Sequence, residues 1–379
     1  MKIFFFIRCL ELGGAERQLV NLAVNLKERG HEIFVATMYS GGDLAAILSQ
    51  ADIAIYSLEK KSRWHLIRPF LRLLKLRRSV NPDVLHSYGP EVNVLATMAH
   101  FFSSNKALVW GIRNAGLDLR MYGRFERALY RIQCALSKFP DLIIANSNEG
   151  RLSGIRDGFS PNRLEVVHNG INTQVFKPND FERNQTRLRL GIASNKKVVG
   201  VVGRIDPQKD HRTFIESISL LPEALLSEIR VACIGYESED QIRELKIKVV
   251  QSGLSKIFLW VPRQKDSYRL INSLDLLVSS SNAEGFSNVL AEALAMGIPC
   301  VATDVGDSKQ IVSNFGLIVP PQDPPALALG ISRALNDHSF QGPAYKVAAR
   351  AHVVDNFSVD QLGDKTEGLL SQLVGINTL

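Results

Sequence analysis

Cysteine is sparse in this chain of 379 residues, and its four cysteines lie far apart in the sequence. No CxxC pair and no mixed cluster of cysteine and histidine occurs, so nothing indicates a disulfide framework or a zinc site. Cys9, Cys233 and Cys300 lie in or beside short apolar runs. We therefore expect reduced, buried thiols, as in proteins of the cytoplasm.

Long apolar runs are also missing, since nowhere do about 18 apolar residues follow one another, and no transmembrane helix is predicted. The apolar run from Ile3 to Ile7 is too short for a signal peptide, because Arg8 and Glu11 interrupt it. Low-complexity tracts and internal repeats are absent as well. The sequence predicts a cytoplasmic protein whose membrane contact, if any, is peripheral and on the inner face of the cytoplasmic membrane.

Short apolar runs alternate with segments of helical period, a pattern typical of parallel sheets. Seven such runs precede Pro178 and six follow it, while the polar passage 179–197 has the composition of a linker. We predict an α/β fold with two doubly wound Rossmann-like domains, 1–177 and 178–356, facing each other across a deep cleft. Residues 357–379 contain a further predicted helix.

Two glycine-containing turns follow predicted strands. Gly13 and Gly14 precede a helix, where glycine lets the backbone approach a ligand and free amides favour an anion. Gly203 and Arg204 end the first strand of the second domain, and Lys209 follows five residues later. A guanidinium and an ammonium suit a diphosphate, although a structural turn and a solvated basic turn would explain the same residues.

The stretch NAEGFSNVLAEALAMG follows a later strand of the second domain. Ser287 is a candidate N-cap for a helix that ends at Gly297, so the amides of Phe286 to Val289 could bind phosphate or sugar oxygens. Glu284 and Glu292 could be the acid and base of a hydrolase, but their cationic neighbours suit a phosphorylated donor. Carboxylates beside a diphosphate would accept hydrogen bonds from sugar hydroxyls.

In this order the motifs resemble family 4 of the retaining glycosyltransferases, which have the GT-B fold of two facing Rossmann-like domains. The resemblance spans nearly the whole chain and rests on LGGAER, EVVHNGINTQVFKP, Gly203-Arg204 with Lys209, and EGFSNVLAEALAMGIPCVATDVG. It implies a nucleotide-diphospho-sugar donor, with UDP preferred to GDP, and retention by front-face displacement. It also implies a saccharide or polyprenyl-linked acceptor in surface polysaccharide, lipopolysaccharide or glycolipid biosynthesis, and a C-terminal helix that crosses back to the first domain.

The same resemblance implies the role of each matching residue. Glu292 would hold the ribose hydroxyls, and Glu284 would contact the transferred sugar. Arg204 and Lys209 would neutralise the diphosphate leaving group. The other implied donor-binding positions are Gly13, Gly14, Gly203, Gly285, Phe286, Ser287, Asn288 and Val289, with Arg263 near the base.

The sequence contains no DxD, the acidic pair with which other transferases hold a divalent ion, so no metal or other cofactor is expected. Cationic side chains can stabilise the leaving group instead. Many family members carry a histidine where this chain has Arg113 and Asn114. Arg113 either takes over part of that role or forms a structural salt bridge. His86 either faces the cleft or is a satisfied core histidine.

The net charge of +7 arises entirely in the first half of the chain. Up to Lys177 there are 24 Lys and Arg against 15 Asp and Glu, and the remainder holds 21 against 23. An anionic partner is therefore expected there. Two basic stripes have helical spacing, namely Lys61, His65, Arg68, Arg72 and Lys75, and Arg120, Arg124, Arg127 and Arg131. They would face water, an anionic saccharide or an anionic membrane surface.

Nucleic acid is not the expected partner, because no base-stacking aromatic residues are interleaved with these charges. Two alternatives to a glycosyltransferase stay open. A sugar-nucleotide epimerase of related fold would interconvert nucleotides without an acceptor. A basic binding module without enzymatic activity would bind nucleic acid in a salt-sensitive manner.

Overall fold

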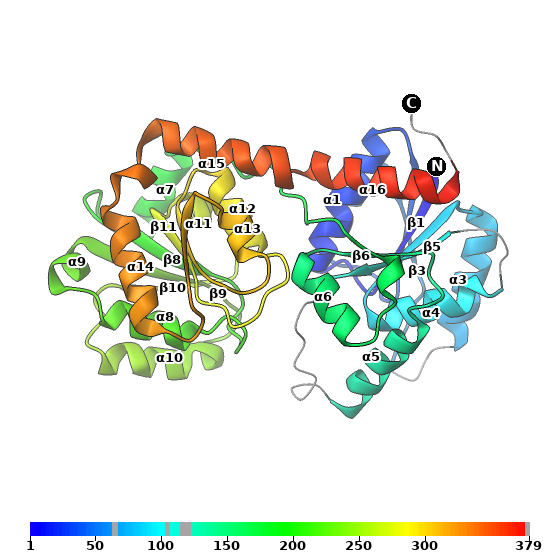
Figure 1. Cartoon of the computed structure of the whole chain (residues 1–379), viewed down its shortest axis with the longest axis horizontal. Helices are drawn as coiled ribbons and strands as arrows, with labels where there is room; N and C mark the ends of the chain where they lie inside the picture. The colour runs from blue at the N-terminus through cyan, green and yellow to red at the C-terminus, as the bar shows by residue number, and fades with distance from the viewer. Residues whose placement is uncertain (63–66, 103–106, 114–122, 376–379) are drawn as a thin grey trace. The chain divides into compact units, whose positions relative to one another are not determined.

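The chain folds into two units, described by a computed structural model over residues 1–62, 67–102, 107–113 and 123–375 (Figure 1). Unit 1 comprises Met1–Gly170 and Val359–Leu379, and unit 2 comprises Ile171–Ser358. The chain therefore first passes from unit 1 to unit 2 after Gly170, before the boundary predicted at Pro178, and we call this passage the first crossing. His65, Asn114 and Arg120 of the sequence predictions lie outside the described residues.

Hydrogen bonds explain why the first crossing lies at Gly170. The side chain of Gln18 binds both the N–H and the carbonyl of Gly170 within unit 1, at 2.8 and 2.9 Å. The next residue, Ile171, donates to the carbonyl of Phe357 at 2.7 Å within unit 2. These backbone contacts fix the boundary, whereas the prediction relied on composition, which changes only after Pro178.

Unit 1 contains a parallel seven-stranded sheet in the order β3-β2-β1-β4-β5-β6-β7. Its strands are apolar because both faces are covered: Phe4 and Phe6 of β1 pack into one core cluster, and Ile3, Phe5 and Ile7 into the other. The seven predicted strands are confirmed, and they are β1 (Lys2–Ile7), β2 (Glu32–Thr37), β3 (Ala54–Ser57), β4 (Val84–Tyr88), β5 (Ala107–Ile112), β6 (Leu142–Ala145) and β7 (Leu164–Val166).

Two helical layers cover this sheet. One layer contains α3, α4, α5 and α6, and the other contains α1, α2 and α16. The helix α16 thus returns to unit 1 from the far end of the chain, as the family resemblance implied, although it begins at Val359. The helices are α1 (Gly14–Glu28), α2 (Ala45–Gln50), α3 (Ile67–Val80), α4 (Pro90–His100), α5 (Arg124–Leu136), α6 (Asn148–Arg156) and α16 (Val359–Val374).

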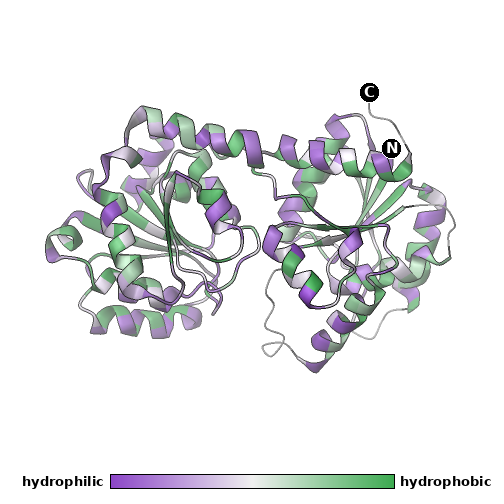
Figure 2. Ribbon diagram, in the orientation of Figure 1, coloured by the Kyte–Doolittle hydropathy of each residue, from purple (hydrophilic) through white to green (hydrophobic). Residues whose placement is uncertain are grey.

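Unit 2 contains a parallel six-stranded sheet in the order β10-β9-β8-β11-β12-β13. In Figure 2 the strands of both sheets are largely green, as expected for buried parallel strands. The strands are β8 (Lys197–Val202), β9 (Ile229–Tyr236), β10 (Phe258–Pro262), β11 (Leu276–Ser279), β12 (Cys300–Thr303) and β13 (Gly316–Val319). The helices are α7 (Asp180–Arg189), α8 (His211–Ser219), α9 (Glu223–Glu228), α10 (Glu239–Gln251), α11 (Ser267–Asn272), α12 (Asn288–Ala295), α13 (Ser308–Val312), α14 (Pro324–Asn336) and α15 (Gly342–Phe357).

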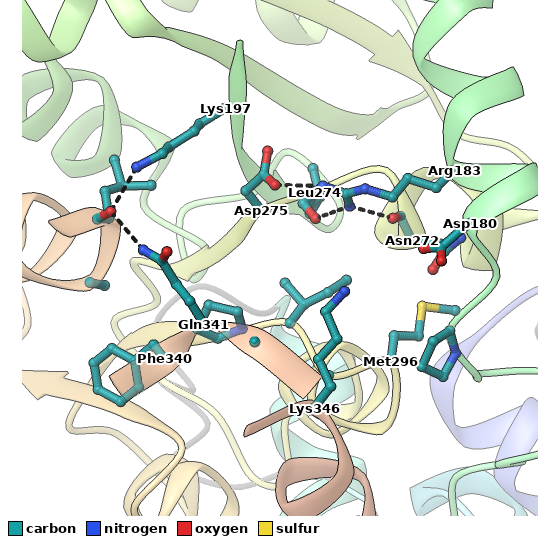
Figure 3. Close-up of a pocket in the computed structure, with 17 residues that line it drawn as sticks. Asp180, Arg183, Lys197, Asn272, Leu274, Asp275, Met296, Phe340, Gln341 and Lys346 are labelled. Carbon is teal, nitrogen blue, oxygen red and sulfur yellow. Dashed lines mark hydrogen bonds and ion pairs between the residues drawn. The ribbon is translucent and has the colours of Figure 1, made fainter. Parts of the chain in front are cut away.

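The predicted linker 179–197 was wrong for its first half, which forms helix α7. Asn179 caps this helix by accepting the N–H of Glu182 at 3.1 Å. Arg183 and Arg187 then bind the two carboxylate oxygens of Asp275, each at 2.5 Å. Figure 3 shows the contact of Arg183. The charges that resembled a linker therefore attach the helix to unit 2.

The remaining general predictions concern cysteine and membrane spans. All four cysteines are unpaired, and burial raises the pKa of Cys233 and Cys300 above the ordinary range. Over the described ranges of the chain, no helix is both long enough and apolar enough to cross a bilayer.

Candidate functional site

The loops that follow β8 and β11 meet at the carboxyl edge of the unit 2 sheet. The two strands are neighbours, and the strand order reverses between them, which is where open α/β sheets bind ligands. Ser280 donates its hydroxyl to the carbonyl of Lys209 at 2.9 Å, and the N–H of Asn282 donates to Gln208 at 2.7 Å. The two loops are therefore joined into one surface.

Lys209 and Glu284 form an ion pair on this surface, through Nζ of Lys209 and Oε1 of Glu284. The hydroxyl of Ser281, which is buried, donates to the same Oε1 at 2.7 Å. Both donors use one carboxylate oxygen, so Oε2 remains oriented for another donor. The structure thus brings together two of the predicted site residues and adds Ser281.

Arg204 lies at the same strand end but makes a different contact. Its side chain is 71% exposed, and the guanidinium is 3.5 Å from Oδ2 of Asp206. The other oxygen of Asp206 accepts the amides of Gln208 and Lys209, at 2.9 and 3.2 Å. Asp206 therefore shapes the turn, and Arg204 places an exposed positive charge beside it.

Helix α12 begins beside Glu284 with its N-terminus at this edge. Ser287 occupies the predicted N-cap position, but its hydroxyl makes no capping hydrogen bond. Phe286 packs its ring against Phe357 at 5.3 Å between centroids, so only its backbone is available to a ligand. Glu292 is buried within the helix, and Gly297 ends it with a φ of +70° as predicted.

The loop after β12 supports the Glu284 loop from behind. The N–H of Asp307 donates to the carbonyl of Gly285 at 3.0 Å. Gly306 has a φ of +56°, and a Cβ there would lie less than 3 Å from the carbonyl oxygens of Glu284 and Gly285. Only glycine fits this position. Gly306 had no predicted role, although a glycine shortly after a predicted strand was an available signal.

Several buried polar atoms at this edge have no hydrogen-bond partner within the part of the chain that the structure describes. They belong to residues that follow β8, β11 and β12, namely His211, Asn282, Ser287 and Ser308. An unsatisfied buried polar group costs about 1 to 3 kcal/mol, so a polar ligand that bonded to these atoms would be favoured at this edge. Burial lowers the pKa of His211 to about 4, so its imidazole is neutral at pH 7.

Arg263 and Gly203 occupy neighbouring strand ends. Arg263 follows β10 and forms an ion pair with Glu237 at 2.5 Å. The N–H of Gly203 donates to Ile234 at 2.9 Å. A Cβ on the adjacent Gly235, whose φ is +120°, would clash with the carbonyl of Gly203. Both predicted positions therefore lie at the carboxyl edge of the sheet, beside the Lys209–Glu284 pair.

In unit 1 the predicted glycine turn lies at the start of α1. Gly13 occupies the N-cap position and Gly14 is the first helical residue. A Cβ on Gly13 would collide with the carboxylate of Glu16. The carboxylate of Glu16 therefore lies over the start of α1, and an anion would have to displace it to reach the amides there.

Arg113 follows β5 of unit 1 and is held by neutral groups. It donates to Oδ1 of Asn169 at 2.7 Å and to the hydroxyl of Tyr88 at 3.3 Å, and its guanidinium lies 5.0 Å from the centre of the Tyr88 ring. Across the described ranges no carboxylate pairs with Arg113, so the structural salt bridge is not found there.

His86 is fully buried beside Arg113. Its ring stacks on Tyr88 at 4.5 Å and lies 5.4 Å from Phe5. Neither ring nitrogen has a partner among the residues the structure describes. Burial and then the charge of Arg113 hold the pKa of His86 well below its usual value. It is a core histidine, but not a satisfied one.

A cavity of about 230 Å³ lies at the opposite, amino edge of the unit 2 sheet (Figure 3). Lys197 donates to the carbonyl of Leu335 at 2.8 Å there, and Arg183 donates to the carbonyl of Asn272 at 2.8 Å. These polar groups are satisfied by the fold, in contrast to those at the carboxyl edge.

In the described ranges no group of three or more His, Cys, Asp or Glu side chains could hold a metal ion.

Two family models match this chain. "Glycosyltransferase Family 4" matches residues 12–175, and "Glycosyl transferases group 1" matches residues 196–337. The lipopolysaccharide core biosynthesis mannosyltransferase LpsB of Rhizobium meliloti (strain 1021) is 31% identical over 252 residues, which are 62% of this chain and 68% of that protein.

Further relatives cover nearly the whole length. An N-acetylgalactosaminyltransferase of Campylobacter jejuni, named for a diphospho-undecaprenol acceptor, is 26% identical over 365 residues, 92% of this chain and 94% of that protein. Among solved structures, Anabaena Alr3699/HepE in complex with UDP-glucose has a TM-score of 0.85 at 21% identity, over 98% of this chain and 100% of that chain. That similarity shows a shared fold.

Proposed function

Since the chain belongs to family 4 of the glycosyltransferases and has their GT-B fold, we propose that it moves a sugar from a UDP-linked donor, with retention of configuration, to a saccharide or lipid-linked saccharide. One observation carries the donor assignment. The ion pair of Lys209 and Glu284 lies beside the start of α12, among buried polar groups without partners, at the edge where α/β sheets bind ligands.

The two carboxylates have separate roles in this proposal. Oε2 of Glu284 accepts hydrogen bonds from hydroxyls of the transferred sugar, because Ser281 and Lys209 occupy Oε1. Glu292 accepts the ribose hydroxyls from within α12. The amides of Gly285 to Val289 bind phosphate and sugar oxygens between them, with Arg263 beside the base.

The leaving diphosphate is neutralised by cations of the protein. Lys209 can exchange its contact with Glu284 for a phosphate oxygen, and the exposed Arg204 can bind bidentately. Fixed charges stabilise the transition state where negative charge develops on the leaving group. No metal ion is needed in this account, so turnover is expected to persist in EDTA.

The acceptor proposal rests on the relatives. The names of the Rhizobium and Campylobacter proteins specify lipopolysaccharide core biosynthesis and a diphospho-undecaprenol-linked saccharide. We therefore place this enzyme in surface polysaccharide or lipopolysaccharide assembly. Arg113, fixed by Tyr88 and Asn169, takes part of the role of the family histidine toward the transferred sugar.

A screen of UDP- and GDP-sugars tests the proposal by thermal stabilisation and by release of nucleotide, with and without a lipid-linked saccharide. We expect one UDP-sugar to raise the melting temperature, and Lys209→Ala and Glu292→Ala to abolish that rise. Lys248→Ala, which removes a surface ion pair with Glu216 on α8, is the matched control and should behave as wild type.

Three results would contradict the proposal. If no nucleotide-sugar raised the melting temperature, the proposed donor would be wrong. Interconversion of two nucleotide-sugars without an acceptor would identify an epimerase instead. A product whose new glycosidic bond has the inverted anomeric configuration, measured by NMR, would exclude retention.

A further inference from the structure

Helix α12, which carries Glu292 and begins beside Glu284, is too short to keep its place by itself. It has eight residues, and the side chain of its N-cap, Ser287, makes no capping hydrogen bond. Helices shorter than about 12 residues are marginal without tertiary contacts. The positions of Glu292 and of the first amides of α12 therefore depend on what packs against this helix.

Helix α15 lies along α12 and contacts it at both ends (Figure 1). At the C-terminal end, Nη1 of Arg350 donates to the carbonyl of Ala295, the last residue of α12, at 2.8 Å. Just before the N-terminal end, the ring of Phe286 packs on that of Phe357, with centroids 5.3 Å apart. Arg350 and Phe357 are two turns apart on α15, or about 10 Å, which nearly matches the length of about 12 Å for α12.

Both contacts suit the chemistry of the places where they occur. The last carbonyls of a helix lack intrahelical donors and form the negative end of its dipole, where a guanidinium group is favourable. Arg350 forms no ion pair within the described residues, and its three acceptors there are all backbone carbonyls. Phe286 and Phe357 are buried in the same core cluster, so their ring contact is fixed by packing.

The same two residues of α15 also hold the chain that follows the first crossing. Arg350 donates to the carbonyls of Thr173 and Phe176, at 2.7 and 2.9 Å. The carbonyl of Phe357 accepts the N–H of Ile171 at 2.7 Å. A displacement of α12 would therefore strain contacts with this stretch of chain, and order in this stretch would in turn hold α12.

We propose that Arg350 and Phe357 are positioning residues of the donor site. Through α12 they place Glu292 and the amides at the helix start, and they link donor binding to the order of residues 171–176. Such coupling is reciprocal, so a bound donor should order that segment. The inference rests on the proposed function, because it concerns how α12 receives the donor.

Calorimetric titration with UDP and amide hydrogen exchange, both on the full-length protein, test the proposal. UDP should slow amide exchange in residues 171–176 of wild type by at least about threefold. Arg350→Ala should weaken UDP binding by about tenfold or more and abolish this slowing, because hydrogen bonds from a charged group are lost. Millimolar guanidinium chloride should restore both, since the ion can bind where the side chain was.

Phe357→Leu is a second variant that should fold, because leucine keeps most of the apolar volume. It removes the ring contact with Phe286 and should weaken UDP binding by about threefold. Guanidinium should have no effect on its affinity.

Matched controls come from unit 2 away from α12. Arg333→Ala removes an exposed arginine of α14. Phe340→Leu removes a ring contact with Tyr345, near the other end of α15. Both should bind UDP with wild-type affinity and show the same slowing of exchange in residues 171–176.

The results separate this inference from the proposed function. If wild type binds UDP and both Arg350→Ala and Phe357→Leu bind it equally well, the positioning roles are wrong and the proposed function stands. If guanidinium fails to restore Arg350→Ala and both variants melt at lower temperatures, the two residues support only the stability of unit 2, which also overturns the inference. If wild type binds neither UDP nor any UDP-sugar, the proposed function fails and this inference fails with it.

Discussion

The carboxylate of Glu284 receives two donors on one oxygen, and Ser281 supplies the neutral one at 2.7 Å. Without it, the carboxylate can rotate about its last bond and Oε2 loses its orientation. We predict that Ser281→Ala lowers kcat about tenfold, since a hydrogen bond to a charged group contributes about 1.5 to 3 kcal/mol. The affinity for UDP, measured by calorimetry, should not change.

The control for this change is Ser279→Ala, because Ser279 is also buried and its hydroxyl lies 3.4 Å from the hydroxyl of Ser281 rather than on Glu284. It should keep wild-type kcat. Equal losses of kcat and of UDP affinity in Ser281→Ala would show that the hydroxyl supports the whole loop rather than the carboxylate.

His211 makes the stability of unit 2 dependent on pH. Its pKa of about 4 in the fold lies below the ordinary 6.5, so the unfolded chain binds more protons between these values. The contribution is complete above about pH 6.5 and is lost as the pH falls toward 4. We predict that the free energy of unfolding falls by about 2 kcal/mol from this group between pH 7.5 and 5.

Urea unfolding at both pH values tests this, with His211→Leu as the variant and His338→Leu, an exposed site, as the control. The difference between the two pH values should shrink in His211→Leu and stay the same in His338→Leu. An unchanged difference in His211→Leu would contradict the assignment.

At the scale of elements, the loop after β12 positions the loop that carries Glu284. Gly306→Ala would force a Cβ against the carbonyls of Glu284 and Gly285, at a φ of +56°. We predict a loss of turnover of roughly 100-fold, because small displacements of a positioned group cost that much. Gly191→Ala has a similar φ of +66° and open space around it, so it should cost about 1 kcal/mol in stability and leave turnover intact.

Elements that depend on local pattern could be predicted from the sequence, and those that depend on distant contacts could not. The strands of both sheets were predicted because parallel strands are apolar throughout. Helix α7 was missed because its arginines form ion pairs with Asp275, which lies far away in the chain. Gly306 and the partners of Arg113 were missed for the same reason, since each acts through a residue on another loop. Ser281 was missed although it lies only three residues before Glu284, on the same loop.

At the scale of the molecule, α16 attaches the end of the chain to unit 1. Arg29 binds Asp364 at 2.5 Å and Glu367 at 3.1 Å, and His31 binds Glu367 at 2.8 Å. Burial raises the pKa of Glu367, but the hydrogen bonds from His31 and Arg29 outweigh it, so this pKa lies below its usual value. This attachment is therefore fully present above the ordinary carboxyl pKa, and it is lost as the pH falls from there through the lowered pKa of Glu367.

We predict that Arg29→Ala speeds amide hydrogen exchange throughout Val359–Val374, by at least about fivefold, because two charged contacts are lost. Arg243→Ala removes an exposed ion pair with Asp240 on α10 and should leave this exchange unchanged. Slow exchange of α16 in Arg29→Ala would show that the apolar contacts of Leu362 and Leu370 hold the helix without these charges.

In the proposed function, unit 2 holds the donor with two carboxylates, Glu284 for the sugar and Glu292 for the ribose. Calorimetric titration of the full-length protein with UDP and with the matching UDP-sugar tests it most directly. Glu292→Gln should weaken both ligands, whereas Glu284→Gln should weaken only the UDP-sugar and leave UDP at wild-type affinity. Wild-type affinity of both variants for both ligands, or equal weakening of UDP by both, would contradict the account.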